Sequence, residues 1–507
     1  MIPLLIASLL LSWACGFLLT SLLCPPRENG ADGRALRLFI GGGLGLGISS
    51  CSYFICLWAG HPRLISAVDL GLLLLLVIAG FARVRGALLE WRQPSQRAEK
   101  PPGFLLILAG IFSLELIASA ASFFFAWLKE PHGRWDAWLI WNMHARFLFR
   151  GGDHWRDAFA SGLDWSHWDY PLLLPLGIAR SWQYMGGEGL SVPAVIAFLF
   201  TVMTVGLLCS ALFSLRGRSH GYLAGMVLLG TPFFIMMGAS QFADVPFAFF
   251  VLATFVLLAL YGRSTDCPGA LILAGLAAGL CAWTKNEGLL FVMVVTVSFF
   301  AMAARADGWR TAVRRTALLL AGALPALLMV VWFKTQLAPA NDLVSGAAPA
   351  AIAARLTDFG RYGEIAKAFF FTGLSFTQGL VDVRVGMRLN PGAVSVLLLA
   401  AYLLLAGLRI DGRDRPGLVR SAAILGLMLI GYFFVYVLTP LDLGYHLTTS
   451  LNRLFLQFWP GGIFLCFMMA GVPESDPYRE DQPGAPAGPV ETATARGSKP
   501  RKAGKPK

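Results

Sequence analysis

Charged residues are scarce in this chain of 507 residues, and their scarcity excludes a soluble globular protein. Only 14% of the residues are Asp, Glu, Lys or Arg, against 56% hydrophobic residues and a mean hydropathy of +0.65. A soluble domain carries about 25% charged residues. Lipid is therefore the expected solvent, in which helices satisfy their own backbone hydrogen bonds.

Cysteine and clustered carboxylates are also lacking. The eight cysteines are scattered and form no CxxC motif, so neither a disulfide framework nor a zinc site is expected. No carboxylate cluster typical of a cation site occurs in the loops, so we predict no obligatory metal and no cofactor. The net charge of +12 is spread over membrane-flanking loops rather than along one stripe, which argues against a nucleic-acid partner.

Long apolar runs, by contrast, are abundant. A membrane-crossing helix needs about 20 apolar residues, and the chain offers thirteen candidate runs. They lie near 2–23, 38–59, 64–82, 104–127, 190–214, 221–238, 245–261, 269–284, 288–304, 316–333, 391–407, 419–438 and 454–471. The sequence therefore predicts an all-α polytopic membrane protein with about 13 transmembrane helices.

Lys and Arg gather in alternate loops, which predicts the orientation because cationic loops resist translocation. The rule favours an outward N-terminus and an inward C-terminus, and we expect the membrane to be a bacterial cytoplasmic (inner) membrane. The first run lacks both a preceding basic residue and a small-residue cleavage pattern, so we expect it to remain as a helix. Residues 472–507 are poor in apolar side chains and predict a disordered basic cytoplasmic tail.

Two long loops then face the periplasm or exterior, near 129–189 and 334–390. Eight of the fifteen tryptophans fall between Trp127 and Trp182, and all of them except Trp127 lie in the first of these loops. One surface helix is expected over 136–150. A second is expected to start with Pro171 in its first position and to end at Gly186 and Gly187.

Two features inside apolar runs need separate interpretations. The GGGLGLG run at 41–47 resembles a phosphate-binding loop, but no strand precedes it, so it favours close packing between helices. Glu115 lies halfway along the fourth run, where an ionised carboxylate is costly, so we expect it to be protonated or paired.

Five motifs in a fixed order carry a resemblance to a known family. They are WDAW at 135–138, HWDYPLLLP at 167–175, FADVPFAFF at 242–250, WTKNEGLL at 283–290 and YHLTTSLNRLFLQFWP at 445–460. Together they resemble the GT-C superfamily of membrane glycosyltransferases, in the branch of protein mannosyltransferases and aminoarabinose transferases. The resemblance covers 104–471, which leaves 1–103 as an N-terminal three-helix extension.

The resemblance implies an inverting transferase that moves a sugar from a polyprenyl phosphate to an acceptor outside the membrane. Asp136 is then the catalytic base, which takes a proton from the acceptor. Its alternative is a simple N-cap at the start of a helix. Asp169 is the second acidic candidate, and it too has a helix-start alternative before Tyr170 and Pro171.

The departing phosphate needs cations. Lys285 and Arg453, with His446 upstream, are the candidates for holding it, although a local ion pair between Lys285 and Glu287 is the other interpretation of that lysine. Contacts to the sugar or acceptor are expected from Trp138, Trp141, His144, Asp164, His167, Tyr170 and Asp244. Each tryptophan has membrane anchoring as an alternative role.

The acceptor is predicted from a departure from the family pattern. Protein mannosyltransferases carry an Asp-Glu pair in the first loop, whereas Ala137 follows Asp136 here. That favours a glycolipid or an envelope polysaccharide over a protein. A secondary transporter or lipid-linked sugar translocase, and an inactive relative, remain the alternatives, because a carboxylate inside a span is typical of transport.

Overall fold

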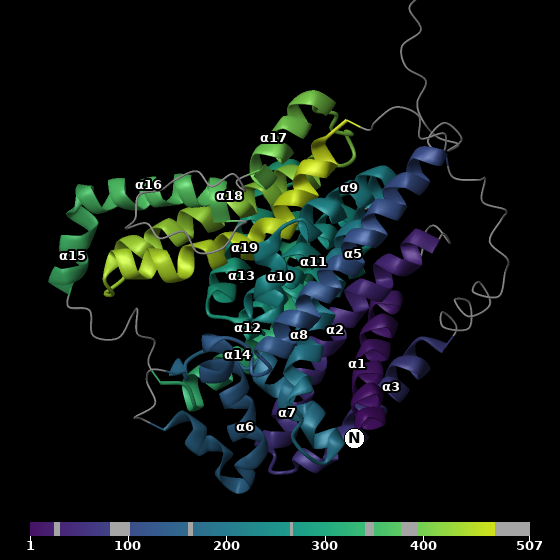
Figure 1. Ribbon diagram of the computed structural model, residues 1–507, viewed down its shortest axis with the longest axis vertical. Helices are drawn as coiled ribbons and strands as arrows, with labels where there is room; N and C mark the ends of the chain where they lie inside the picture. The colour runs from purple at the N-terminus through teal and green to yellow at the C-terminus, as the bar shows by residue number, and fades with distance from the viewer. Residues whose placement is uncertain are drawn as a thin grey trace, which may run out of the picture. The chain divides into compact units, whose positions relative to one another are not determined.

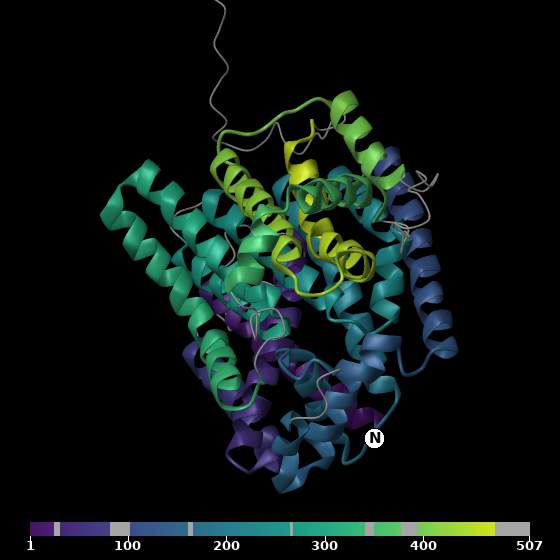
Figure 2. The same cartoon turned by 90° about the vertical axis from the view of Figure 1, so that its left-hand side faces the viewer.

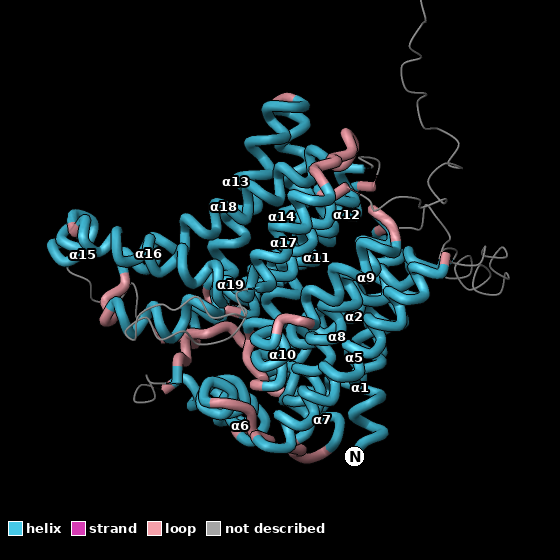
Figure 3. The backbone as a smooth tube through the Cα atoms, turned by 45° about the horizontal axis from the view of Figure 1, so that its top comes forward, coloured by secondary structure: helices cyan, strands magenta, loops and turns pink. Residues whose placement is uncertain are grey.

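The computed structural model describes residues 1–24, 31–81, 102–160, 166–263, 267–339, 349–376 and 394–471. Within these ranges the chain is helical, apart from turns, loops and an isolated β-bridge between Leu408 and Ala470. Figure 3 shows helices joined by loops, with no strand drawn. The prediction of an all-α fold is confirmed for these ranges, and the tail over 472–507 lies outside them.

Figure 1 labels the α-helices in chain order. Their bounds are α1 (Ile2–Leu23), α2 (Ala31–Trp58), α3 (Ile65–Ala79), α5 (Gly103–Lys129), α6 (Asn142–Arg150), α7 (Leu173–Met185), α8 (Ser191–Leu215), α9 (Arg218–Leu229), α10 (Pro232–Ala239), α11 (Asp244–Arg263), α12 (Pro268–Thr284), α13 (Glu287–Asp307), α14 (Trp309–Gln336), α15 (Pro349–Thr357), α16 (Phe359–Ser375), α17 (Val394–Ala406), α18 (Arg415–Leu438) and α19 (Leu443–Met469).

The predicted membrane-crossing runs all fall on helices. Nine helices of the described ranges are long and apolar enough to cross a membrane, and α9 with α10 forms a tenth candidate that bends by 65°. The other three runs fall on α12 and α17, which are shorter apolar helices, and on α19. Arg453 and Gln457 make α19 more polar, and both belong to the site described below. The chain is a multi-pass membrane protein.

Helix α11 lies in the interior of the bundle. Its apolar residues face all directions, the pattern of a helix that is buried on every side. It packs against α8, α12, α18 and α19. Helix α5 differs from α11, because only 11% of its most apolar stretch is buried. Figure 2 shows α5 at the periphery of the bundle. Asp244, the first residue of α11, is thereby placed inside the protein.

The glycine run at 41–47 makes a close helix–helix contact, as predicted. A Cβ atom on Gly45 would lie 1.9 Å from the Ser12 carbonyl oxygen, and one on Gly41 would lie 2.6 Å from the Phe17 Cα. Both contacts join α2 to α1. The backbones approach so closely that a side chain larger than hydrogen has no room, which is the usual role of small residues between membrane helices.

The loop after α5 is ordered into short helices. The helix predicted over 136–150 is a π-helical turn, Ala137–Trp141, that continues into α6. The second predicted helix begins at Leu173, two residues after Pro171, because the preceding residues Asp169 and Tyr170 are used in contacts elsewhere. It ends as predicted, with Gly186 in the left-handed conformation at φ 71°.

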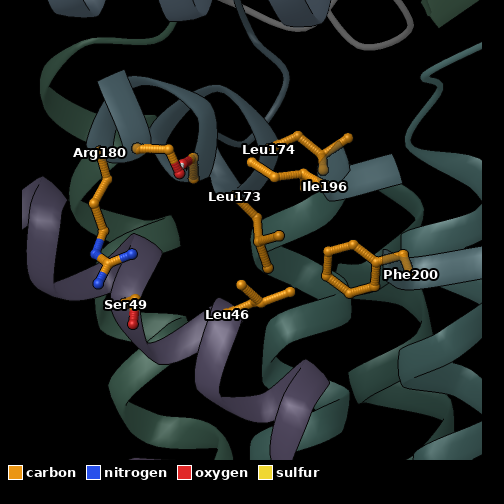
Figure 4. A pocket seen from close by; sticks show the side chains of 9 residues that line it. Leu46, Ser49, Leu173, Leu174, Arg180, Ile196 and Phe200 are labelled. Carbon is orange, nitrogen blue, oxygen red and sulfur yellow. Dashed lines mark hydrogen bonds between the residues drawn. The ribbon is translucent and has the colours of Figure 1, made fainter. Parts of the chain in front are cut away.

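Helices α1, α2 and α3 form one compact unit with the rest of the chain, Met1–Val472. Arg180 of α7 donates to the Asp69 carboxylate of α3 at 2.6 Å and to the Ser8 carbonyl oxygen of α1 at 3.2 Å. Figure 4 shows Arg180 reaching toward α2, near Ser49. The cavity beside it measures about 10 Å³, room for about one water molecule and too small for a substrate.

Candidate active site

Ends of several helices meet at one end of the bundle and bring polar residues together there. Asp136 follows the end of α5, Asp244 begins α11, and Lys285 lies between the end of α12 and the start of α13. Arg453 extends toward them from α19, and Lys334 comes from the last turn of α14. Successive helices run in opposite directions, so residues far apart in the sequence collect at one membrane face.

Arg453 bridges two carboxylates at the centre of this group. Its Nη1 atom lies 2.6 Å from Asp136 Oδ2, and its Nε atom lies 2.9 Å from Asp244 Oδ2. Asp136 precedes the π-helical turn but its side chain makes no capping hydrogen bond there. The carboxylate therefore serves the ion pair, and the simple N-cap alternative does not describe it.

Asp244 is the buried anchor of the group. It has no exposed surface, and it accepts hydrogen bonds from Lys285 Nζ at 3.0 Å and Gln457 Nε2 at 2.8 Å, besides Arg453. Tyr432 in turn donates to Gln457 Oε1 at 2.8 Å. A buried carboxylate is stable when several donors compensate its charge, so Asp244 holds both cations in place.

Lys285 has two carboxylate partners. Its Nζ atom lies 3.0 Å from Asp244 and 2.9 Å from Glu287 Oε1. Burial by itself would lower the pKa of Lys285, but Asp244 and Glu287 outweigh burial and raise that pKa above its ordinary value. The lysine therefore stays charged, and the local pair with Glu287 and the position in the wider group are both present.

Asp169 lies beside this group, and its own partners hold it. Asn286 Nδ2, adjacent to Lys285, donates to Asp169 Oδ2 at 2.7 Å, and Lys334 contacts the same carboxylate at 3.4 Å and also the Asp169 carbonyl oxygen. Asp169 is buried and precedes α7 by four residues. Its helix-start alternative therefore does not describe it either.

Aromatic rings cover the group on the side of the first loop. Tyr170 stacks on Trp141 with ring centroids 5.5 Å apart and on His167 at 5.1 Å. Burial and then the carboxylates of Glu287 and Asp169 hold the pKa of the Tyr170 hydroxyl well above its ordinary value, so this hydroxyl stays protonated. Tyr170 therefore offers a hydrogen-bond donor beside the carboxylates.

His144 and Trp141 lie deeper, in the core of the loop. Both are fully buried, and the imidazole of His144 stacks on Trp168 at 4.0 Å. Burial lowers the pKa of His144 to about 3, so the imidazole is neutral at physiological pH. Trp138 is exposed and lines an open cavity of about 660 Å³, together with Glu130, Pro131, His132, Gly133, Arg146 and Arg150.

The other predicted site residues lie at the margin. His446 contacts Thr439 Oγ1 at 3.0 Å and the Tyr436 ring at 4.7 Å, and burial lowers its pKa to about 4. It is therefore neutral near pH 7. Asp164 lies outside the described residues. No group of three or more His, Cys, Asp or Glu side chains suited to a metal occurs within the described ranges.

Backbone strain is concentrated next to the site. Among the non-glycine residues described, positive φ angles occur at His167, with φ 51°, and at Gln241, with φ 62°. Gln241 precedes Asp244 by three residues and accepts a hydrogen bond from Asn142 at 2.8 Å. Such conformations persist where surrounding contacts enforce them, and they are frequent at functional sites.

Sequence reasoning missed four supporting residues: Asn286, Lys334, Tyr432 and Gln457. The signal for one of them is local, because Arg453 and Gln457 lie four residues apart in an apolar helix and so share a face. The signal for Asn286 is its place beside Lys285 in WTKNEGLL. Lys334 and Tyr432 carry no local signal, because only the packing of α14 and α18 shows where they point.

The arrangement has a definite chemical capacity. Arg453 and Lys285 are two fixed cations that can hold an anion such as a phosphate. Asp136 lies at the partly exposed edge of the pair and can take a proton from a bound hydroxyl or amine. Asp169 presents a second carboxylate close by, on a neighbouring segment.

A comparison with known protein families matches one part of the chain. The family model described as dolichyl-phosphate-mannose-protein mannosyltransferase matches residues 169–333. Asp169, Asp244 and Lys285 fall within the matched segment, whereas Asp136 and Arg453 lie outside it. Neither the curated proteins nor the solved structures give a match. The match confirms the predicted resemblance over less than half of the chain: residues 169–333 are similar to the dolichyl-phosphate-mannose-protein mannosyltransferase family of GT-C membrane glycosyltransferases.

Proposed function

We propose that this protein is an inverting glycosyltransferase that moves a sugar from a polyprenyl-phosphate donor to an envelope acceptor on the extracytoplasmic side of a bacterial cytoplasmic membrane. One observation carries the proposal: Arg453 contacts the carboxylates of both Asp136 and Asp244, and Lys285 contacts the other carboxylate oxygen of Asp244. This arrangement supports the proposal, because it brings a carboxylate suited to the role of base together with two cations.

The roles follow from the bonds that change. The acceptor hydroxyl or amine attacks the anomeric carbon and its proton passes to the Asp136 carboxylate. The bond between the anomeric carbon and the phosphate oxygen breaks, and its electron pair leaves with the polyprenyl phosphate. Lys285 and Arg453 stabilise the charge on that phosphate. Attack from the side opposite the phosphate inverts the anomeric centre.

The neighbouring residues supply position rather than proton transfer. Asp169 orients the acceptor, because Asn286 and Lys334 fix its carboxylate beside the cations. Tyr170 and His167 present stacked rings for a pyranose. Trp141 and His144, in the core of the loop, support these rings. Trp138 contacts the acceptor from the open cavity. His446 donates a hydrogen bond to the phosphate as a neutral imidazole.

The acceptor class rests on Ala137, which replaces the second acidic residue of the protein mannosyltransferase motif. A glycolipid or polysaccharide acceptor accords with that replacement. The extracytoplasmic location, with the N-terminus outside and the C-terminus inside, rests on the distribution of Lys and Arg among the loops.

Release of polyprenyl phosphate tests the proposal. The purified full chain in lipid nanodiscs is supplied with undecaprenyl-phosphate sugars and candidate envelope acceptors, and free undecaprenyl phosphate is measured. Asp136→Asn is expected to lower turnover by roughly 10²- to 10⁴-fold, the usual contribution of a general base. Asp153→Asn, an exposed aspartate of the same loop, is the matched control and keeps wild-type turnover. Unchanged turnover in Asp136→Asn would remove Asp136 from the role of base.

A transporter or translocase is the second candidate, because of the bend between α9 and α10. A Cβ atom on Gly230, at this bend, would lie 3.0 Å from the Glu115 carboxylate, so a carboxyl group lies against a broken helix inside the membrane. Broken helices and intramembrane carboxylates are typical of transporters. Movement of intact labelled donor across a proteoliposome membrane, without release of free polyprenyl phosphate, would favour this candidate.

A further inference from the structure

We infer that the donor phosphate displaces Asp136 from Arg453, so that binding of the donor releases the catalytic base. The inference rests on the proposed function and extends it to the order of events. In the structure, the guanidinium group that would bind the phosphate is occupied by the carboxylate that would act as base, at 2.6 Å. One cation therefore has two competing anionic partners, and they are used at different stages.

The charges of the group require such an exchange. Arg453 and Lys285 contribute two positive charges, whereas Asp136, Asp244 and Glu287 contribute three negative charges. Asp169 has its own cation, Lys334, and adds no net charge. The phosphodiester of the donor, with one negative charge, would enter a group that is already negative. Repulsion between like charges at this range is costly in a protein interior, so one carboxylate must move away.

Asp244 is the carboxylate least able to move. It is fully buried and accepts from Lys285, Arg453 and Gln457 at 2.8–3.0 Å. Moving it would take one carboxylate partner from each of two cations and would leave the Gln457 amide N–H without its acceptor. It therefore remains as the fixed support from which Arg453 and Lys285 extend.

Asp136 is the carboxylate best placed to move. About 20% of its side chain is exposed, its ion-pair partner is Arg453, and no capping hydrogen bond holds it to the following turn. The geometry of Arg453 points the same way. Asp244 accepts from Nε of the guanidinium group, whereas Asp136 accepts from Nη1, one of the two terminal nitrogens that together can bind a phosphate in a bidentate manner.

Glu287 is the competing choice, because it is also partly exposed and pairs with Lys285. An ammonium group has three donors and can bind a phosphate oxygen without giving up Glu287. A phosphate that binds both Nη1 and Nη2 of Arg453, however, competes with Asp136 for Nη1. Asp136 is therefore the carboxylate that exchanges.

The exchange sets an order of binding. Before the donor binds, Arg453 holds the Asp136 carboxylate through Oδ2, and the carboxylate is directed toward that cation rather than toward an acceptor. After the phosphate takes its place, Asp136 is free to contact the acceptor. The donor then binds first and the acceptor second, and the base is not available while the site lacks a donor.

Binding of farnesyl phosphate to the full chain in nanodiscs tests the exchange, measured by calorimetry without any acceptor. Removal of the Asp136 charge removes the competitor, so Asp136→Asn and Asp136→Ala are expected to bind farnesyl phosphate about tenfold more tightly than wild type, even though turnover is lost. The alanine variant shows that the gain does not come from a new amide donor. Glu188→Gln is the matched control, since Glu188 pairs with Arg150 and Arg146 elsewhere and should leave the affinity unchanged.

Three results would overturn the exchange. Equal or weaker binding by both folded Asp136 variants would show that Asp136 does not compete with the phosphate. A larger gain in Glu287→Gln would assign the exchange to Lys285 and Glu287. Absence of binding in wild type and variants alike would contradict the polyprenyl-phosphate donor itself, and so the proposed function, whereas the first two results leave that function standing.

Discussion

At the scale of single residues, the site is a set of charges that compensate one another. Asp244 and Lys285 are buried, and each has partners of opposite charge within 3.0 Å. A buried charge without a partner destabilises a protein strongly, whereas a paired one does not. Each of these side chains is therefore restrained, and partial exposure singles out Asp136 and Glu287 as the groups that can respond to a ligand.

His144 gives a prediction about pH. Its pKa is lowered by burial to about 3, below the ordinary value of 6.5, so the unfolded chain takes up a proton at a pH where the folded one does not. The stabilisation is complete above about pH 6.5 and is lost as the pH falls toward 3, by at most about 1.4 kcal/mol per pH unit. His144→Phe, which keeps a ring against Trp168, should weaken this dependence.

The apparent unfolding temperature in detergent, measured from about pH 7 to about pH 4.5, checks the effect of His144. The slope should decrease but not vanish, because burial also lowers the pKa of His446 to about 4. Identical pH profiles for wild type and His144→Phe would contradict burial of a neutral imidazole.

The sequence identified several of these residues but not their bonds. Asp136, Asp244, Lys285 and Arg453 stood out because they belong to the motifs that carry the family resemblance. The contact between Asp136 and Arg453 joins residues that are 317 positions apart. No local pattern predicts such a pair, because it depends on how α19 lies against the first loop.

At the scale of elements, small residues set how closely helices approach. Gly275 and Gly322 join α12 and α14 in the same way as Gly41 and Gly45 join α1 and α2, since a Cβ on either residue would lie within 1.9 Å of a carbonyl oxygen of the other helix. The close contact between α12 and α14 positions the end of α12, and hence Lys285.

Gly45→Ala tests this packing. Alanine is normally the better helix former, by about 1 kcal/mol, but here its Cβ would overlap the Ser12 carbonyl oxygen. We expect a loss of stability of about 1–3 kcal/mol from overpacking. Gly71→Ala in α3, where nothing lies within 4 Å, is the control and should be neutral or stabilising. Chemical or thermal unfolding measures both, and stabilisation by Gly45→Ala would contradict the close approach.

The element boundaries show where local patterns stop being informative. The C-terminal end of α7 follows from Gly186, a residue suited to the left-handed conformation it adopts. The N-terminal end was expected at Pro171 and lies at Leu173, because tertiary contacts of Asp169 and Tyr170 hold the preceding segment in a turn. Strong backbone preferences are read from sequence, but a competing tertiary contact is not.

At the scale of the whole molecule, the first three helices support the site. Arg180 contacts Asp69 in α3 and Ser8 in α1, and Tyr184 donates to Asp69 at 2.7 Å. Helix α7, which carries Arg180, begins four residues after Asp169. This buried contact therefore helps to position the segment that bears the second site carboxylate.

Arg180→Met tests the support. It leaves the Asp69 carboxylate buried without its cation, and loss of one partner of a buried pair costs about 3–5 kcal/mol. The double variant Arg180→Met with Asp69→Leu removes both charges and should recover most of the stability. Thermal unfolding measures both variants. Equal stabilities of the single and double variants would contradict a buried, mutually compensating pair.

The sequence by itself determined that this chain lies in a membrane, which segments are helices and which residue types carry chemistry. These properties depend on hydropathy and backbone preference, which act over short stretches of chain. Only the tertiary structure decided that Arg453 lies between Asp136 and Asp244, although Asp244 is 209 positions away in the sequence. It alone also decided that Asn286 and Lys334 hold Asp169. Such contacts depend on the angles and distances at which helices pack, which side chains from the whole bundle determine together.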